Sequence, residues 1–423
     1  QLFARNFVGS IFQFGFHYTV LGYDIYLGEI LLAIAALFIF AFICMQNKRV
    51  ICIIMSVLSA IFFVIVAAVF MLVIFKDTNL VRGFQPAFVP DSDAIGQVMR
   101  IACISPWAFI GFENISHSAE EFKFKKTKTF RILVAAVITS ALLYIFFLIL
   151  STSAFPRRFG TWLEYINTIP NLTGIEALPV FYAAQTYLGN SGVILLLIAL
   201  LAIVITSLIG NMTALSRLFY ALSKDKILPN AFSRLNKNGV PVNALLLIAA
   251  ISSIVPFFGR TAIGWIVDVT TLGATLVYGY VSASAFRMAR RENNKHVTVT
   301  GIAGTACMII MGLFLIVPNF FLSGEIATES YLLFIIWAVL GFLFFRWILK
   351  NDVDRRFGHS MIVWLVFIFL ILFIALIWMS TSTVSVATKG MDNIYTFFTR
   401  KQYATNDIAT LKNFMNGEYI SLN

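Results

Sequence analysis

Long apolar runs alternate with short polar connections along the whole chain. Runs of this length suit a hydrocarbon core about 30 Å thick, which a helix crosses in about 20 residues. Short segments of strict apolar–polar alternation, which would indicate a transmembrane barrel, are not visible. The expected fold class is therefore all-α, a polytopic helical membrane protein. We predict ten spans, at about 28–44, 50–75, 97–115, 131–155, 191–220, 242–258, 263–288, 297–321, 331–349 and 361–379.

Composition agrees with this pattern, since 60% of the 423 residues are hydrophobic and 12% are charged. Soluble domains are closer to half apolar and a quarter charged. The formal charge of +11 raises the question of a nucleic-acid partner. The basic residues, however, gather in alternate connections, at 48–49, 123–131, 217–237, 287–295 and 346–356. The positive-inside rule places these connections in the cytoplasm and the segment before residue 28 outside. The expected partner is the lipid bilayer of the cell membrane, not nucleic acid.

The regions between and beyond the spans define the expected organisation. Residues 1–27 are aromatic and glycine-rich and predict an external interfacial segment. Residues 28–383 form the expected transmembrane domain, and 384–423 form a polar C-terminal tail. The longest external connection, 156–190, contains LPVFYAAQTYLG, which predicts a short surface helix.

The first residue is Gln, and an external N-terminus without a leader is unusual for a protein made in the cytoplasm. We expect a fragment that lacks an odd number of upstream spans; the alternative is an unusual protein whose N-terminus lies outside. No disulfide framework, zinc site or other cofactor is expected, because the cysteines and histidines show no paired spacing. These residues are Cys44, Cys52, Cys103, Cys307, His17, His117, His296 and His359.

One stretch interrupts its own hydrophobicity: residues 105–131 read SPWAFIGFENISHSAEEFKFKKTKTFR. Pro106 and Gly111 lower the cost of leaving helical geometry. Glu113 is costly inside a span unless it faces a cavity or a partner. Unwound backbone is tolerated in a membrane only where it lines such a cavity. The stretch therefore fits either a ligand-binding break or a packed helix whose acid is satisfied by a neighbour.

Three segments carry a resemblance to a known family. WAFIGFE (107–113) with AEE (119–121) resembles the sixth transmembrane helix of amino-acid permeases of the amino acid–polyamine–organocation superfamily. NMTALSRLFYALSKDKILPNAFSRLNKNGVPVNALL (211–246) is similar to the end of the family's eighth helix and the loop that follows it. DVTTLGATLVYGYVSASAFRMARR (268–291) is similar to its tenth helix. The resemblance implies the LeuT-like inverted-repeat fold, with the family's first three helices absent from this chain.

In this family the substrate lies at the midplane, between the broken first and sixth helices. The resemblance thus implies Trp107 as an aromatic gate and Glu113 as a polar or gating contact. The first helix, which binds the substrate carboxylate in the family, has no counterpart here. The remaining implied substrate-site residues form the wall and the free backbone: Ala108, Phe109, Ile110, Gly111 and Phe112.

Thr206 and Ser207 lie in the middle of a span, where sodium-coupled relatives place a similar hydroxyl pair. The alternative is that these hydroxyls bond to their own helix or pack against a neighbour. Some proton-coupled relatives carry a Lys in the fifth helix, and span 50–75 contains none. Na⁺ and H⁺ both remain candidate coupling ions. Asp268 fits an external gate or a side chain that reaches water, and Glu29 suits the start of a helix.

The expected function is a secondary active transporter of amino acids that works by alternating access. A polyamine or organic-cation transporter, and a non-transporting sensor or partner subunit on the same fold, are the alternatives, because fold does not settle function. An intramembrane enzyme would need clustered acids, and only Asp91 and Asp93 come near, in an external loop. We therefore expect no enzyme. The amino acid, the coupling ion and the oligomeric state are not determined by the sequence.

Overall fold

The structure is a computed structural model that describes residues 5, 9–20, 23–76, 85–90, 93–121, 125, 127–316, 328–351, 365, 368, 369, 372, 373 and 376. The chain divides into two compact units, Gln1–Glu325 and Ile326–Asn423. The tail predicted for 384–423, and most of the span predicted at 361–379, lie outside the described residues.

In the described residues of the first unit, the regular elements are helices and one β-hairpin near the N-terminus. Its α-helices are α1 (Leu27–Cys44), α2 (Lys48–Lys76), α3 (Ala94–Phe109), α4 (Thr127–Ser153), α5 (Trp162–Thr168), α6 (Pro179–Leu188), α7 (Asn190–Lys224), α8 (Val242–Ser252), α9 (Ala262–Arg291) and α10 (Lys295–Ile316). Its 3-10 helices are η2 (Gly9–Phe12), η4 (Phe112–Glu121), η5 (Ile169–Asn171), η6 (Gly174–Ala177), η7 (Asn230–Ser233) and η8 (Val255–Thr261). The described part of the second unit contains α11 (Thr328–Asn351).

The predicted membrane spans are confirmed over most of the described chain. Among the residues that the structure describes, eight helical segments are long and apolar enough to cross a bilayer: 27–44, 48–76, 128–153, 190–224, 242–259, 262–291, 295–315 and 332–350. The span predicted at 97–115 differs, because α3 has only 16 residues and the chain continues from it as η4. The protein is a multi-pass helical membrane protein, and within the described residues the span predicted at 97–115 is interrupted.

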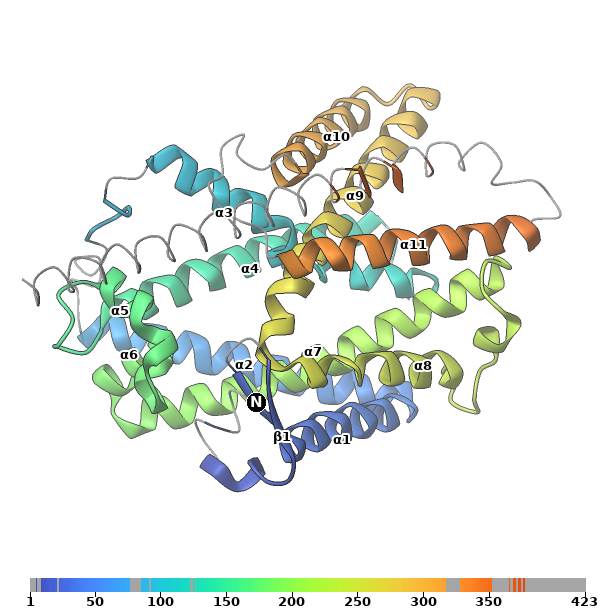
Figure 1. The fold of residues 1–423 in the computed structure, drawn as a ribbon. Coiled ribbons are helices and arrows are strands. Elements are labelled where there is room, and N and C mark those ends of the chain that lie inside the picture. Colours follow the sequence, from blue (N-terminus) through green and yellow to red (C-terminus); the bar gives the residue numbers. More distant parts are fainter. Residues whose placement is uncertain are drawn as a thin grey trace, which may run out of the picture. The chain divides into compact units, whose positions relative to one another are not determined.

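Helix α7 organises the packing of the first unit. It has 35 residues, which corresponds to about 50 Å of helix. Toward its start, Leu196, Ala199 and Ala202 pack with buried residues of α2, α4 and α6. Further along, Ile209 and Met212 pack with α1, α2 and α8. Figure 1 shows α7 running beside α2 and α8, so one long helix joins two separate apolar clusters.

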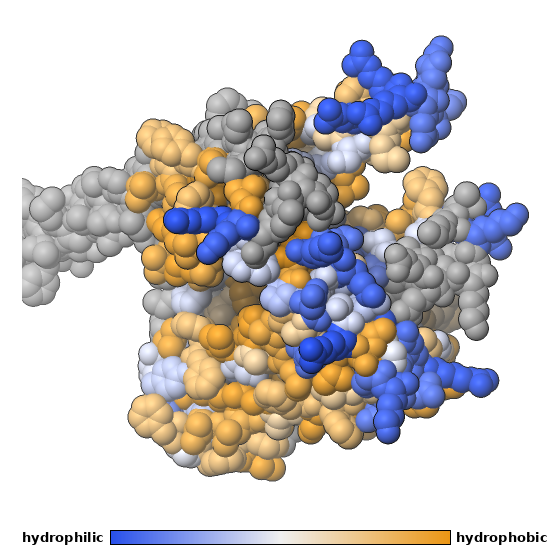
Figure 2. Space-filling view, turned by 90° about the vertical axis from the view of Figure 1, so that its right-hand side faces the viewer, coloured by the Kyte–Doolittle hydropathy of each residue, from blue (hydrophilic) through white to orange (hydrophobic). Residues whose placement is uncertain are grey.

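Apolar side chains also cover the outer surface of the helices. Val64 and Phe75 of α2 are 67% and 82% exposed, and Ile101 of α3 is 72% exposed. Figure 2 shows hydrophobic residues over much of the face it presents. Soluble monomers rarely expose apolar patches of this extent. A hydrocarbon environment explains them, because lipid tails are as apolar as these side chains.

The N-terminal segment forms a small β-hairpin that the sequence analysis did not predict. Strands β1 (His17–Val20) and β2 (Tyr23–Tyr26) pair antiparallel, with His17 opposite Tyr26. The hairpin contacts η8, where the Tyr18 hydroxyl donates to the carbonyl of Phe257. Residues 1–27 and the connection after α8 are both predicted to be external, so this contact joins two loops on the same predicted side.

Glu29 lies in the first turn of α1, as predicted, and is only 2% exposed. Arg5 donates from Nε to Glu29 Oε1 at 2.6 Å and from Nη2 to Glu29 Oε2 at 2.9 Å. It also donates to the carbonyl of Asp24 in β2. The acid therefore has a structural role: a two-pronged ion pair and the positive end of the helix dipole both stabilise the carboxylate.

The connection between α4 and α7 forms a folded cap. The surface helix predicted from LPVFYAAQTYLG is confirmed as α6, which contacts α2, α4 and α7. Tyr165 of α5 is fully buried and donates its hydroxyl to the carbonyl of Glu176 at 2.6 Å. Burial, reinforced by Tyr182 and Glu176, raises the pKa of Tyr165 to about 12. The cap therefore has a packed interior of its own.

Candidate substrate site at the interrupted helix

The interruption of α3 lies at the residues from which the sequence predicted it. The helix ends at Phe109, and Ile110 turns extended with φ −54° and ψ 134°. Gly111 follows with φ +114°, a conformation that side-chain-bearing residues rarely adopt. Pro106 lies inside the last turns and cannot donate a backbone hydrogen bond. The span thus loses regular α-helical bonding at Ile110 and Gly111 and resumes as η4.

Glu113 closes the interruption on one side. Its Oε2 accepts the N–H of Gly111 at 2.9 Å and the hydroxyl of Tyr278 in α9 at 3.2 Å. The rings of Phe112 and Tyr278 lie with their centroids 5.7 Å apart. The acid inside the span is therefore satisfied partly by the backbone that the break releases and partly by a neighbouring helix, which lowers the cost of burying it.

Helices α4 and α7 hold the interruption on its other sides. Tyr144 of α4 donates its hydroxyl to the carbonyl of Ala108, and its ring meets Phe109 edge-on at 5.7 Å. Asn114 donates from Nδ2 to Oδ1 of Asn211 in α7 at 2.8 Å. Three helices that are distant in sequence thus converge on residues 108–114.

The predicted substrate-site residues lie together because they are consecutive, but their environments differ. Trp107 and Ile110 are 40% and 42% exposed. Ala108, Phe109, Gly111, Phe112 and Glu113 are half-buried. The interruption therefore presents one aromatic and one aliphatic side chain outward, while its polar contacts face the neighbouring helices.

The two predicted ion-site hydroxyls make different contacts. Thr206 donates to the carbonyl of Ala202 within its own helix at 2.7 Å, as the alternative interpretation expected. Ser207 accepts a hydrogen bond from Nδ2 of Asn211 at 3.3 Å. Asn211 thereby links Ser207 to Asn114 at the interruption. Among the described residues, no group of three or more His, Cys, Asp or Glu side chains could hold a metal ion.

Asp268, the predicted gate, lies half-buried in α9. It precedes Tyr278 by ten residues on the same helix, which corresponds to about 15 Å along the axis. Asp268 and Tyr278 therefore lie at different depths along α9, so Asp268 lies about 15 Å away along the axis from the Glu113–Tyr278 contact.

Sequence reasoning missed the partners of the interruption, which are Tyr144, Tyr278 and Asn211. A usable signal was present, because each is a polar side chain in the middle of an apolar span, where unpartnered hydrogen-bonding groups are costly. That signal marks the residues but does not show which of them meet.

Comparisons with known proteins identify the family and several relatives. A family model described as amino acid permease matches residues 2–330. An arginine/ornithine antiporter of Pseudomonas aeruginosa is 25% identical over 159 residues, 37% of this chain and 30% of that protein. The arginine/ornithine antiporter ArcD1 of Lactococcus lactis is 26% identical over 240 residues, 55% of this chain and 42% of that protein.

A histidine permease, HisP of Lactococcus lactis, is 32% identical over 96 residues, 21% of this chain and 20% of that protein. The chain thus aligns with less than half the length of each of these three relatives.

Proposed function

The chain belongs to the amino acid permease family, and on that premise we propose that it acts in the secondary active transport of amino acids by alternating access. The substrate site in this proposal is the interruption at residues 107–113. The observation that carries it is the non-helical backbone at Ile110 and Gly111, inside the segment 97–115 that the hydropathy pattern predicts to be a membrane span. Irregular backbone at membrane depth is a feature of sites that bind polar ligands.

The side chains around the break have distinct roles in this proposal. Trp107 and Ile110, which are exposed, contact the substrate. Glu113 acts as a gate, because a carboxylate that already bridges Gly111 and Tyr278 can release one partner when the segments move. Alternating access then requires that substrate and coupling ion bind the two states with different affinity.

Ser207, with Asn211 and Asn114, supplies oxygen atoms close to the break, and hard oxygen ligands suit a small cation such as Na⁺. The hydroxyl of Thr206 donates its proton within its own helix, but its oxygen still has lone pairs that could bind a cation. We propose that Thr206 and Ser207 contribute to a coupling-ion site, and that Asp268 belongs to an outer gate.

Uptake by the protein in liposomes tests the proposal. The names of the relatives place arginine, ornithine, lysine and histidine first in the panel of amino acids. A sodium gradient, a proton gradient and preloaded amino acid would be compared as driving forces. Failure to take up any amino acid under all three conditions would count against transport, and binding without uptake would favour a sensor.

Gly111→Leu tests the assigned site. The positive φ of Gly111 is strained for leucine, and the new side chain would enter the break. We therefore expect the protein to lose the thermal stabilisation that the substrate produces. Gly264→Leu is the matched control, since Gly264 has open space around it and lies in α9. Unchanged amino-acid affinity in a folded Gly111→Leu protein would remove the site from residues 107–113.

A further inference from the structure

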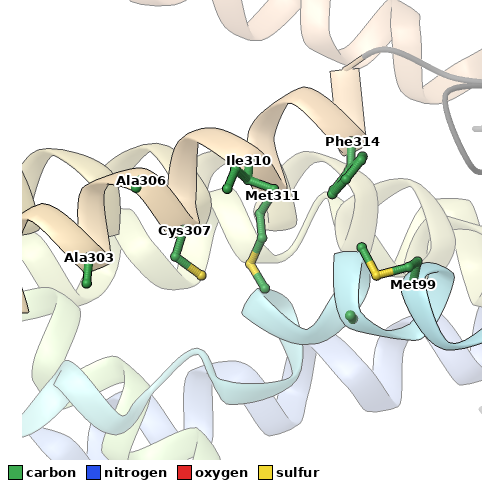
Figure 3. Close-up of a pocket in the computed structure, with 8 residues that line it drawn as sticks. Met99, Ala303, Ala306, Cys307, Ile310, Met311 and Phe314 are labelled. Carbon is green, nitrogen blue, oxygen red and sulfur yellow. The ribbon is translucent and has the colours of Figure 1, made fainter.

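A cavity of about 350 Å³ lies between α3 and α10 (Figure 3), and its lining residues lie outside the interruption at residues 107–113. All its lining side chains are apolar, except for the thiol of Cys307. A charged amino acid would lose its hydration there without gaining partners, so this cavity does not suit a polar substrate. The residues that define it are Met99, Ala102, Ala303, Cys307, Met311 and Phe314.

The cavity opens toward the surroundings of the protein. Ala303, Ala306 and Cys307, which line it, are exposed. Ile302 and Ile309 beside them on α10 are 51% and 57% exposed. Since α10 is a membrane span, this surface meets lipid, and the cavity continues the lipid-facing surface inward.

The length of the cavity matches one lipid chain. From Ala303 to Phe314 the lining runs along twelve residues of α10, with about 16 Å of helix between the first and the last. Half of a hydrocarbon core, which one acyl chain spans, is about 15 Å. Met99 and Met311 face the cavity from opposite helices in Figure 3, and flexible thioether side chains adapt to an irregular chain.

We propose that this cavity binds an acyl chain of a membrane phospholipid between α3 and α10. The acyl chain is already in hydrocarbon before it binds, so it gains nothing from leaving water. Van der Waals packing contacts with the lining side chains therefore hold it in the cavity. The bound chain lies against the helix that ends at the interruption. The proposal concerns lipid binding alone and does not depend on what the protein transports.

Photo-crosslinking tests this binding directly. The protein would be reconstituted in phosphatidylcholine carrying a diazirine on one acyl chain, irradiated, and its adducts mapped by mass spectrometry. We expect adducts concentrated around Met99 and Met311, in excess of those on the exposed apolar surface of α2. Ala306→Trp, which fills the cavity, should lower the adducts on α3 several-fold. Ile309→Trp, on the exposed surface of the same helix, should leave them unchanged.

A second manipulation avoids any effect on folding. Alkylation of Cys307 in the folded protein with a bulky maleimide, in a background in which Cys52 and Cys103 are replaced by alanine, should lower the same adducts. Equal labelling of all lipid-facing helices, insensitive to Ala306→Trp and to alkylation, would overturn the proposal. An absence of adducts on both α3 and α10, as expected if another protein segment fills the cavity, would overturn it as well.

Discussion

The carboxylate of Glu113 supports the interruption through one oxygen atom. That atom accepts from the backbone of Gly111 and from the hydroxyl of Tyr278, so it joins the broken segment to α9. Hydrogen bonds to a charged group contribute more than neutral ones, about 1.5–3 kcal/mol each. Because both bonds share one acceptor, removal of either partner changes the environment of the other.

A double-mutant cycle measures this coupling. We expect Glu113→Gln and Tyr278→Phe each to lower the unfolding midpoint in detergent, and the double variant to lose less than the sum. The coupling energy should be on the order of 1 kcal/mol, as for other residues in direct contact. Tyr280→Phe is the matched control, since Tyr280 lies on the same helix and is 49% exposed. Strictly additive losses would mean that the contact contributes nothing.

Tyr165 gives the cap between α4 and α7 a pH dependence. Its pKa is raised to about 12 because its hydroxyl is buried. An unfolded tyrosine ionises near pH 10. Below pH 10 both states keep the proton, and as the pH rises from 10 to 12 only the unfolded state releases it. The stability that the cap gains from neutral Tyr165 is therefore lost over that interval.

Absorbance titration at 295 nm checks this prediction. The difference between the wild-type protein and Tyr165→Phe should show one tyrosine that ionises near pH 12. The unfolding midpoint should also fall more steeply between pH 10 and 12 in the wild type. A difference curve centred near pH 10 would show that the hydroxyl is accessible to solvent.

At the scale of elements, α9 and α10 pack closely because two glycines of α10 face α9. A Cβ at Gly301 would lie 2.8 Å from the backbone nitrogen of Phe286, and one at Gly304 would lie 2.7 Å from Oγ of Ser282. Small residues at such contacts let membrane helices approach, which strengthens packing and weak interhelical contacts. The two helices therefore form a tight antiparallel pair.

Gly301→Ala tests the close approach. The added methyl group would overlap backbone atoms that cannot move aside, and we expect a loss of about 1–3 kcal/mol in stability. Gly273→Ala in α9 is the control, because its Cβ meets nothing within 4 Å. Alanine there should be neutral or slightly stabilising, as for glycine in other helix interiors. Equal midpoints for the two variants would contradict the packing.

The sequence predicted the helices well because each span is long and continuously apolar. Pro106, Gly111 and Glu113 act locally on the backbone of their own helix, but alone they left a break and a packed helix equally open, and the resemblance to the permease family implied the break. The hairpin at 17–26 was missed because its aromatic residues fit an interfacial segment equally well. The partners of the break are contacts across more than thirty residues of sequence, and hydropathy carries no information about which polar residues meet.

At the scale of the whole molecule, contacts between connections agree with the topology predicted from charge. Asn236 and Asn238 donate to the carbonyl of Met45, and these loops are both predicted to be cytoplasmic. Lys76 donates to the carbonyl of Tyr187 at 2.7 Å, and both are predicted to be external. The positive-inside rule uses only the distribution of Lys and Arg, so hydrogen bonds in the folded chain are an independent check.

Cysteine accessibility provides the direct test of this topology. In a background without native cysteines, a single cysteine would replace either Asn171 in the external connection or Lys237 in the cytoplasmic one. Both positions are exposed, so the two sites differ in sidedness and not in burial. We expect a membrane-impermeant maleimide to label Asn171→Cys in intact cells and to label Lys237→Cys only after permeabilisation. The reverse result would invert the topology and place the basic loops outside. Labelling of both sites in intact cells would indicate that the protein inserts in two orientations. The charge asymmetry between its two sides would then be too weak to select one of them.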